Sequence, residues 1–300
     1  MAITASPDPA NDDSPATTAP QRAGGVWACF VREVEDTLVR TGHVWLENPL
    51  TIVTFIGRLI AAIPAGVRAF RTRAGAARAS RRLIGQFLGT LLRGVVLVGV
   101  LGLAGGLAVG TLARAAGSFF LPLIEGTVLP ILVRDLAPLG LAVALAARMG
   151  ASISTQLAVL PAQRHLPVVI FNARELNRRA VPHVVAGFGT APLLFLVMGA
   201  CLLTGYEAFG SVRELARASP ARFFTPAVWP PLVTGAIRAM GFGGVVSIVA
   251  CALGVYAAEH YDSDTGERIE VNQAVWESSA ISVVICAVYT IVFLKTAGQG

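Results

Sequence analysis

Few side chains in this sequence are of types that carry out chemistry. The four histidines, His43, His165, His183 and His260, lie far apart in the chain. The sequence holds no His-Glu-x-x-His zinc motif, no Gly-x-Ser-x-Gly nucleophile motif and no phosphate-binding Gly-x-x-x-x-Gly-Lys-Ser/Thr loop. Its cysteines form no Cys-x-x-Cys pair. We therefore expect no catalytic, metal-binding or cofactor-binding site, and a protein that is not an enzyme.

The ionisable residues inside apolar stretches are the most informative ones. Arg134 and Asp135 are adjacent, and Arg148 ends the same apolar stretch. Neighbouring residues on a helix do not face each other, so we expect Arg134 and Asp135 to have different partners. A structural role in helix packing and a functional role are both open for them. Arg93 and Arg238 are expected near helix ends, where a guanidinium reaches the polar interface.

The composition indicates what kind of element positions these residues. Apolar residues make up 54% of the 300 residues, charged residues only 14%, and the mean hydropathy is +0.66. Soluble domains carry roughly 25% charged residues. Long uncharged stretches account for the deficit, which is typical of an integral membrane protein. The net charge is +6, and the arginines flank apolar segments. The positive-inside rule for membrane proteins explains this placement better than nucleic-acid binding does.

Five apolar stretches have the length and composition of membrane-spanning helices. They cover about residues 87–112, 127–149, 183–205, 236–258 and 277–295. An arginine cluster (Arg68, Arg71, Arg73, Arg78, Arg81 and Arg82) precedes the first stretch and should hold that end in the cytoplasm. Five spans then place the N-terminus inside and residues 150–182 on the cytoplasmic side.

The first of these stretches carries three glycines with four-residue spacing, Gly102, Gly106 and Gly110. Small residues at this spacing let a second helix approach closely. The alternative is that they only reflect frequent use of small residues.

The part of the chain before the five stretches is of a different kind. Residues 1–25 are rich in Pro, Ala, Ser, Thr and Asp, so we expect a disordered tail followed by one membrane domain over residues 26–300. Residues 26–70 are expected to form interfacial helices. Within them, 26–47 is amphipathic, with a solvated helix as the alternative. Residues 50–70 could span a bilayer, but Arg58 near the middle favours an interfacial or partly inserted helix.

Residues 131–163, ILVRDLAPLGLAVALAARMGASISTQLAVLPAQ, carry a resemblance to a known family. They resemble the MlaE/YrbE permeases, the membrane subunits of ABC importers and exporters that work with MCE proteins. In that family one span opens on Arg-Glu-Leu-x-Pro and ends on Gly-Arg-x-Gly. The matching positions are Arg134, Asp135, Leu136 and Pro138 at the opening, with Asp for Glu, and Arg148 and Gly150 at the end, with Ala147 for Gly. The resemblance extends over about residues 26–297.

The resemblance implies that a cytoplasmic coupling helix follows this span and docks on an ATPase. The residues that it implies for coupling are Gln156, Leu157, Leu160, Gln163 and Arg164. The family's helix is acidic, whereas here Gln156 stands in place of Glu and Pro161 and Pro167 interrupt the segment. An ordinary surface loop is the alternative for this segment.

The resemblance further implies an all-α integral membrane protein that serves as the permease subunit of an ABC-type lipid transporter, for a phospholipid, sterol or fatty acid. Its expected partners are an ABC ATPase, a second permease subunit in a homo- or heterodimer, MCE-domain proteins and the lipid, with no cofactor and no nucleic acid. Its expected place is the bacterial inner membrane, with the N-terminus cytoplasmic. Two alternatives are a degenerate, non-transporting scaffold subunit of the same kind of complex, which the divergent coupling segment suggests, and a membrane-embedded enzyme acting on lipids.

Overall fold

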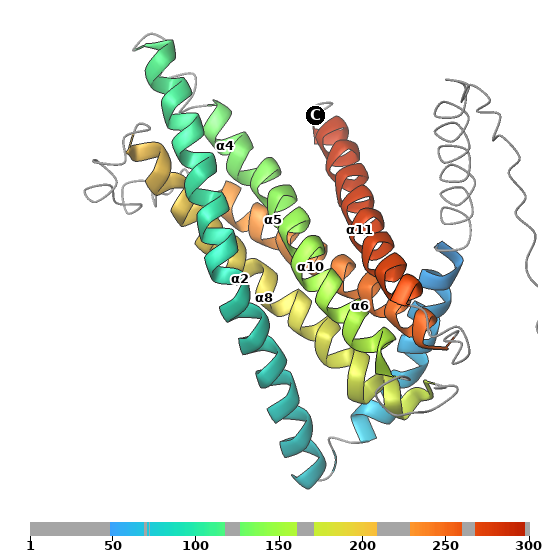
Figure 1. Ribbon diagram of the computed structural model, residues 1–300. Helices are drawn as coiled ribbons and strands as arrows, with labels where there is room; N and C mark the ends of the chain where they lie inside the picture. Colours follow the sequence, from blue (N-terminus) through green and yellow to red (C-terminus); the bar gives the residue numbers. More distant parts are fainter. Residues whose placement is uncertain are drawn as a thin grey trace, which may run out of the picture. The chain divides into compact units, whose positions relative to one another are not determined.

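The computed structural model describes residues 49–68, 71, 73–117, 127–160, 171–208, 229–259 and 268–297 (Figure 1). The expected disordered tail, the amphipathic helix over 26–47, and Gln163 and Arg164 lie outside the described residues. Every regular element within them is a helix, which confirms the all-α fold class. By length and composition, six described helices are able to cross a membrane: Pro49–Arg68, Gly75–Ala116, Leu129–Ala158, Ala173–Glu207, Trp229–Glu259 and Ala274–Val292. Five of them coincide with the five expected spans.

Four long helices form most of the bundle: α2 (Arg73–Ala116), α8 (Ala173–Glu207), α10 (Trp229–Glu259) and α11 (Arg268–Ala297). Their ends follow local sequence signals. The Asn172 side chain caps α8 by accepting a hydrogen bond from the Glu175 backbone N–H at 3.0 Å. After α2, Gly117 adopts a φ of 78°, the left-handed conformation that glycine provides at helix ends.

The second membrane helix is continuous from Leu129 to Ala158 but changes its winding twice. It consists of α4 (Leu129–Ile131), the π-helical η2 (Leu132–Leu136), α5 (Ala137–Leu145), the π-helical η3 (Ala146–Gly150) and α6 (Ala151–Ala158). The helix therefore extends past residue 149, where we expected the span to end. Short π-helical stretches are rare in proteins, but those that occur are often found at functional sites. Both stretches here coincide with the two ends of the family-like motif.

Small residues allow close contacts between the helices, and α10 contacts most of the others. The most extensive contact is between α2 and α8. A Cβ atom built on Gly102 would lie 2.4 Å from the Met198 carbonyl oxygen, and one on Gly106 would lie 2.0 Å from the Leu202 carbonyl oxygen. Both glycines thus sit where the two backbones touch, and Gly110 is buried in the same helix. Helix α10 contacts α8, α11 and the second membrane helix, so it lies at the centre of the packing.

The helix Pro49–Arg68, blue in Figure 1, contacts the ends of other helices. Arg58, near its middle, donates hydrogen bonds to both Glu259 carboxylate oxygens at 2.8 and 2.6 Å and to the Phe171 carbonyl at 2.7 Å. Glu259 is the last residue of α10, and Phe171 lies two residues before α8. The midpoint of this helix therefore contacts a residue just before α8 and the last residue of α10. Whether the helix crosses the membrane or lies at its surface stays a prediction from the sequence, since its length and composition allow a full crossing.

Candidate functional site

A partly open groove of about 510 Å³ lies between α2 and the second membrane helix. Its lining comes from residues 85–98 of α2, from the α5–η3–α6 part of the second helix and from His183 of α8. The lining residues are Gly85, Gln86, Gly89, Thr90, Arg93, Gly94, Leu97, Val98, Ala144, Leu145, Arg148, Met149, Ser152, Ile153, Gln156 and His183. Gly85 and Gly89 leave this wall of the groove without side chains, and a Cβ on either of them would meet no atom within 4 Å. Gly94 faces Leu194 of α8 instead, where a Cβ would lie 2.9 Å from a Leu194 methyl carbon.

The polar residues of the groove form two facing stripes. Gln86, Thr90 and Arg93 follow one another at spacings of four and three on α2, and so lie on one helix face. Arg148, Ser152 and Gln156 repeat at intervals of four across η3 and α6. Because the two helices run antiparallel (Figure 1), both stripes lie toward the same end of the groove. Apolar side chains, among them Leu97, Val98 and Leu145, line the other end.

The groove is positively charged. Its lining includes two arginines and no aspartate or glutamate. Within the described part of the chain, the structure gives neither Arg93 nor Arg148 a hydrogen-bond or ion-pair partner, and both side chains are exposed. A charge inside an apolar stretch is costly and is usually paired. The two guanidiniums are thus available to an anionic group that enters the groove.

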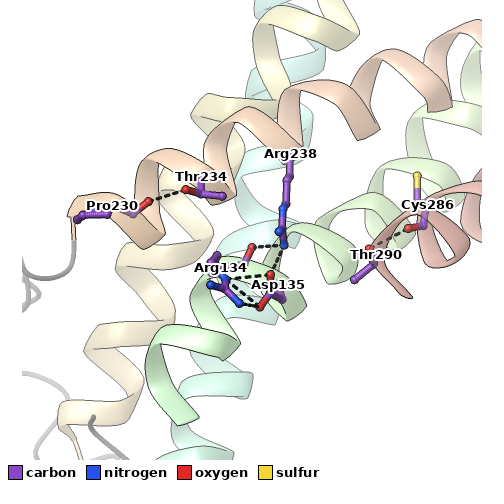
Figure 2. A network of polar contacts seen from close by, with 7 residues as sticks. All are labelled: Arg134, Asp135, Pro230, Thr234, Arg238, Cys286 and Thr290. Atoms are coloured by element: carbon purple, nitrogen blue, oxygen red, sulfur yellow. Dashed lines mark hydrogen bonds and ion pairs between the residues drawn. The ribbon is translucent and has the colours of Figure 1, made fainter. Parts of the chain in front are cut away.

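A second polar cluster is buried and internally paired (Figure 2). Asp135 is only 1% exposed, and Arg238 of α10 is 6% exposed. Nη1 of Arg238 forms an ion pair with Oδ1 of Asp135. The same nitrogen lies 3.3 Å from the Arg134 carbonyl oxygen. Pro138, four residues later, has no N–H to donate to that carbonyl, so the motif proline and the arginine of α10 complement each other.

Two expectations about this cluster were wrong. Arg134 and Asp135 do interact, because the Arg134 side chain folds back and donates from Nε and Nη2 to Oδ2 of Asp135 at 3.0 and 2.9 Å. The long guanidinium arm and the wider π-helical winding of η2 allow this contact between neighbours. Arg238 does not reach toward the interface either. It points into the bundle, because Asp135 is a stronger partner in an apolar surrounding than distant water.

The residues expected to couple to an ATPase are not all at the surface. Leu157 and Leu160 are buried within the chain. Leu157 packs against α10, since a Cβ on Gly254 would meet the Leu157 Cβ at 3.0 Å. Gln156 is exposed and belongs to the groove. Only Gln156 among the described members of this set is therefore free to contact a partner.

The two ends of the family-like motif have different surroundings. Arg148 lies in the groove, whereas Gly150 is buried and faces α10 and α11. The Ser279 hydroxyl of α11 donates to the Ala146 carbonyl at 3.1 Å, which ties α11 to the second π-helical stretch. Among the described residues, no group of three or more His, Cys, Asp or Glu side chains is placed to hold a metal ion.

Comparison with known proteins is consistent with these features. Residues 83–293 match the sequence model of the family described as Permease MlaE, and this match covers well over half of the chain. A probable ABC transporter permease protein of Rickettsia prowazekii (strain Madrid E) is 27% identical over 172 residues, or 55% of this chain. The aligned region spans 63% of that relative's length. The groove and the buried ion pair both lie inside the matched residues, and the chain belongs to the MlaE permease family.

Proposed function

We propose that this chain is the permease subunit of an ABC-type transporter that moves a phospholipid, sterol or fatty acid. The match of residues 83–293 to the permease family carries this proposal. The sequence has no nucleotide-binding Gly-x-x-x-x-Gly-Lys-Ser/Thr loop, so the work of transport would come from a separate ABC ATPase.

The packing of the helices supports a role within a larger complex. In α10, 72% of the most apolar window is buried, whereas the corresponding share is 22% in α2 and 28% in α11. Helices α2 and α11 thus present broad apolar faces that nothing in the described part of this chain covers. A second permease subunit and the bilayer would cover these faces, and the cavity for the transported lipid would form between the two permeases. MCE-domain proteins would receive or supply the lipid.

The coupling surface is proposed on the cytoplasmic side, at the end of α6 and in residues 161–172. Gln156 stands at the start of this surface, and Gln163 and Arg164 would complete it. The motif residues Arg134, Asp135, Pro138 and Gly150 would support coupling indirectly, by fixing the second membrane helix against α10 and α11.

The first experiment is purification of the tagged full-length chain from the organism that encodes it, in a mild detergent. We expect an ABC ATPase to co-purify, and the reconstituted complex to transfer labelled lipid between vesicles only with hydrolysable ATP. A non-hydrolysable ATP analogue serves as the control. A chain that purifies without any ATPase, or a complex whose lipid transfer is the same with both nucleotides, would contradict the proposal.

The burial of Leu157 and Leu160 favours a second candidate, a scaffold subunit that assembles the complex without transmitting work. The double substitution Gln156→Ala/Arg164→Ala separates the two functions. A coupling subunit should keep its ATPase in the complex but lose most of the ATP-dependent lipid transfer. Unchanged transfer would favour the scaffold.

A further inference from the structure

We propose that the groove between α2 and the second membrane helix holds the anionic head group of a bilayer lipid, bound between Arg93 and Arg148. This site is a resident lipid site on one subunit. It is separate from the cavity that two permeases would form for the transported molecule, and it goes beyond the proposed function.

The distribution of polar and apolar residues in the groove matches an amphiphile. One end carries Arg93, Thr90 and Gln86 opposite Arg148, Ser152 and Gln156, all with hydrogen-bond donors. The other end carries Leu97, Val98, Ala144 and Leu145. A phosphate or carboxylate would occupy the polar end, where guanidiniums bind such groups through paired hydrogen bonds. The apolar end would cover the first part of an acyl chain.

Charge decides between anionic and zwitterionic lipids. The lining carries two guanidiniums without a carboxylate, and within the described residues neither Arg93 nor Arg148 has an ion-pair partner. A zwitterionic head group would bring its own cation close to these arginines, where like charges repel. A head group with net negative charge would neutralise them without this cost.

The position of the groove mouth indicates a lipid rather than a free anion. Val96 and Val100 follow Arg93 by three and seven residues, so both valines lie on the Arg93 side of α2. They are 71% and 60% exposed, as expected for apolar side chains that face lipid. The groove therefore lies next to the surface that contacts the bilayer, and the nearest source of an anion is a lipid head group.

Native mass spectrometry of the purified full-length chain in a neutral detergent tests this proposal. Phosphatidylglycerol and phosphatidylcholine with the same acyl chains are added in equal amounts, and the ratio of the two bound species is measured. We expect the wild-type chain to prefer phosphatidylglycerol. The variant Arg93→Gln/Arg148→Gln should lower this preference on the order of tenfold, as expected for the loss of charge-assisted hydrogen bonds.

Two further variants keep the result interpretable. Arg114→Gln removes an exposed arginine of α2 outside the groove and should leave the preference unchanged. Arg93→Lys/Arg148→Lys keeps both charges and should retain a preference for phosphatidylglycerol.

If Arg93→Gln/Arg148→Gln binds both lipids as the wild type does, the proposal is wrong. Displacement of the bound lipid by inorganic phosphate alone would show a simple anion site, and a cross-link between the groove and another protein segment would show a protein occupant. Either result overturns the lipid assignment. The assay needs neither ATP nor an ATPase, so the proposed transport function can fail independently.

Discussion

The Asp135 carboxylate forms ion pairs with two guanidiniums inside a bundle of apolar helices. It pairs with the buried Arg238 on one side and with the partly exposed Arg134 on the other. Separating a buried charge from its partner is costly, because water cannot replace the lost interaction. The cluster therefore specifies how α10 and the second membrane helix are placed along each other.

Substitution of Asp135 tests this role. Asp135→Ala leaves Arg238 buried without its carboxylate, so we expect the free energy of unfolding to fall by about 3–5 kcal/mol. Unfolding by a denaturing detergent in mixed micelles, followed by circular dichroism, measures the change.

Two controls accompany this substitution. Arg134→Gln removes the guanidinium that is 37% exposed and should cost less than about 1 kcal/mol. Asp135→Leu/Arg238→Met removes both buried charges and should recover most of the loss, since apolar pairs of similar size often replace buried ion pairs without cost. If Asp135→Ala is as stable as the wild type, the cluster has no structural role.

At the scale of residues, the sequence indicated less than the structure shows. It identified Arg134, Asp135 and Pro138 as a motif but missed Arg238, which is about a hundred positions away in the chain. The position of Arg238 could have indicated this pair. Asp135 lies six residues after the start of one membrane helix, and Arg238 lies nine residues after the start of another that begins at the same end of the bundle, so their opposite charges are at similar depths. The groove was also missed, although the spacing of Gln86, Thr90 and Arg93 marks a polar helix face.

At the scale of elements, the crossing of α2 and α8 depends on glycine. A Cβ on Gly106 would lie 2.0 Å from the Leu202 carbonyl oxygen, a backbone atom that cannot move alone. Gly106→Ala should therefore push the helices apart and lower the free energy of unfolding by about 1–3 kcal/mol. A Cβ on the neighbouring Gly105 would meet no atom within 4 Å, so Gly105→Ala is the matched control.

The control should be neutral or slightly stabilising, because alanine favours a helix over glycine by about 0.5–1 kcal/mol. The same detergent-induced unfolding measures both variants. Equal stabilities of Gly105→Ala and Gly106→Ala would contradict the close approach of the two helices.

The helix Pro49–Arg68 depends on a small number of polar contacts. Besides the Arg58 contacts, the Asn177 side chain donates a hydrogen bond to the Ala62 carbonyl. Arg58→Gln should loosen this helix and increase amide hydrogen exchange over residues 49–68, without changing exchange in α10 before its last turn. Arg68→Gln, which replaces an exposed arginine at the end of the same helix, should leave the exchange unchanged. Equal exchange in both variants would show that Arg58 does not hold the helix.

The helical elements were largely predictable, because long uncharged apolar stretches leave few alternatives. The five expected spans coincide with described helices. The extension of the second helix to Ala158 was not predicted, since its last part carries Ser152, Thr155 and Gln156 and has the composition of a loop. Their polar groups bond within the helix, as when the Thr155 hydroxyl donates to the Ala151 carbonyl at 2.8 Å.

At the scale of the whole molecule, several polar features lie toward one end of the described bundle, whereas the buried Asp135–Arg238 pair lies toward the other. The polar stripes of the groove, the Arg58–Glu259 pair and the arginines at the start of α2 all lie near this end. The proposed orientation assigns it to the cytoplasm, where the positive-inside rule places arginines and where an ATPase is available. The proposed function depends on this orientation, because a coupling surface on the opposite side could not meet the ATPase.

Site-directed labelling tests the orientation most directly. The four natural cysteines are replaced by alanine, and single cysteines are introduced at the exposed positions Gln156 and Arg114. Both lie near the C-terminal ends of two antiparallel helices, and therefore at opposite ends of the bundle. A membrane-impermeant maleimide is added to right-side-out vesicles before and after permeabilisation. The proposed orientation predicts that Arg114→Cys is labelled in intact vesicles and that Gln156→Cys is labelled only after permeabilisation. Labelling of Gln156→Cys from the outside of intact vesicles would contradict it.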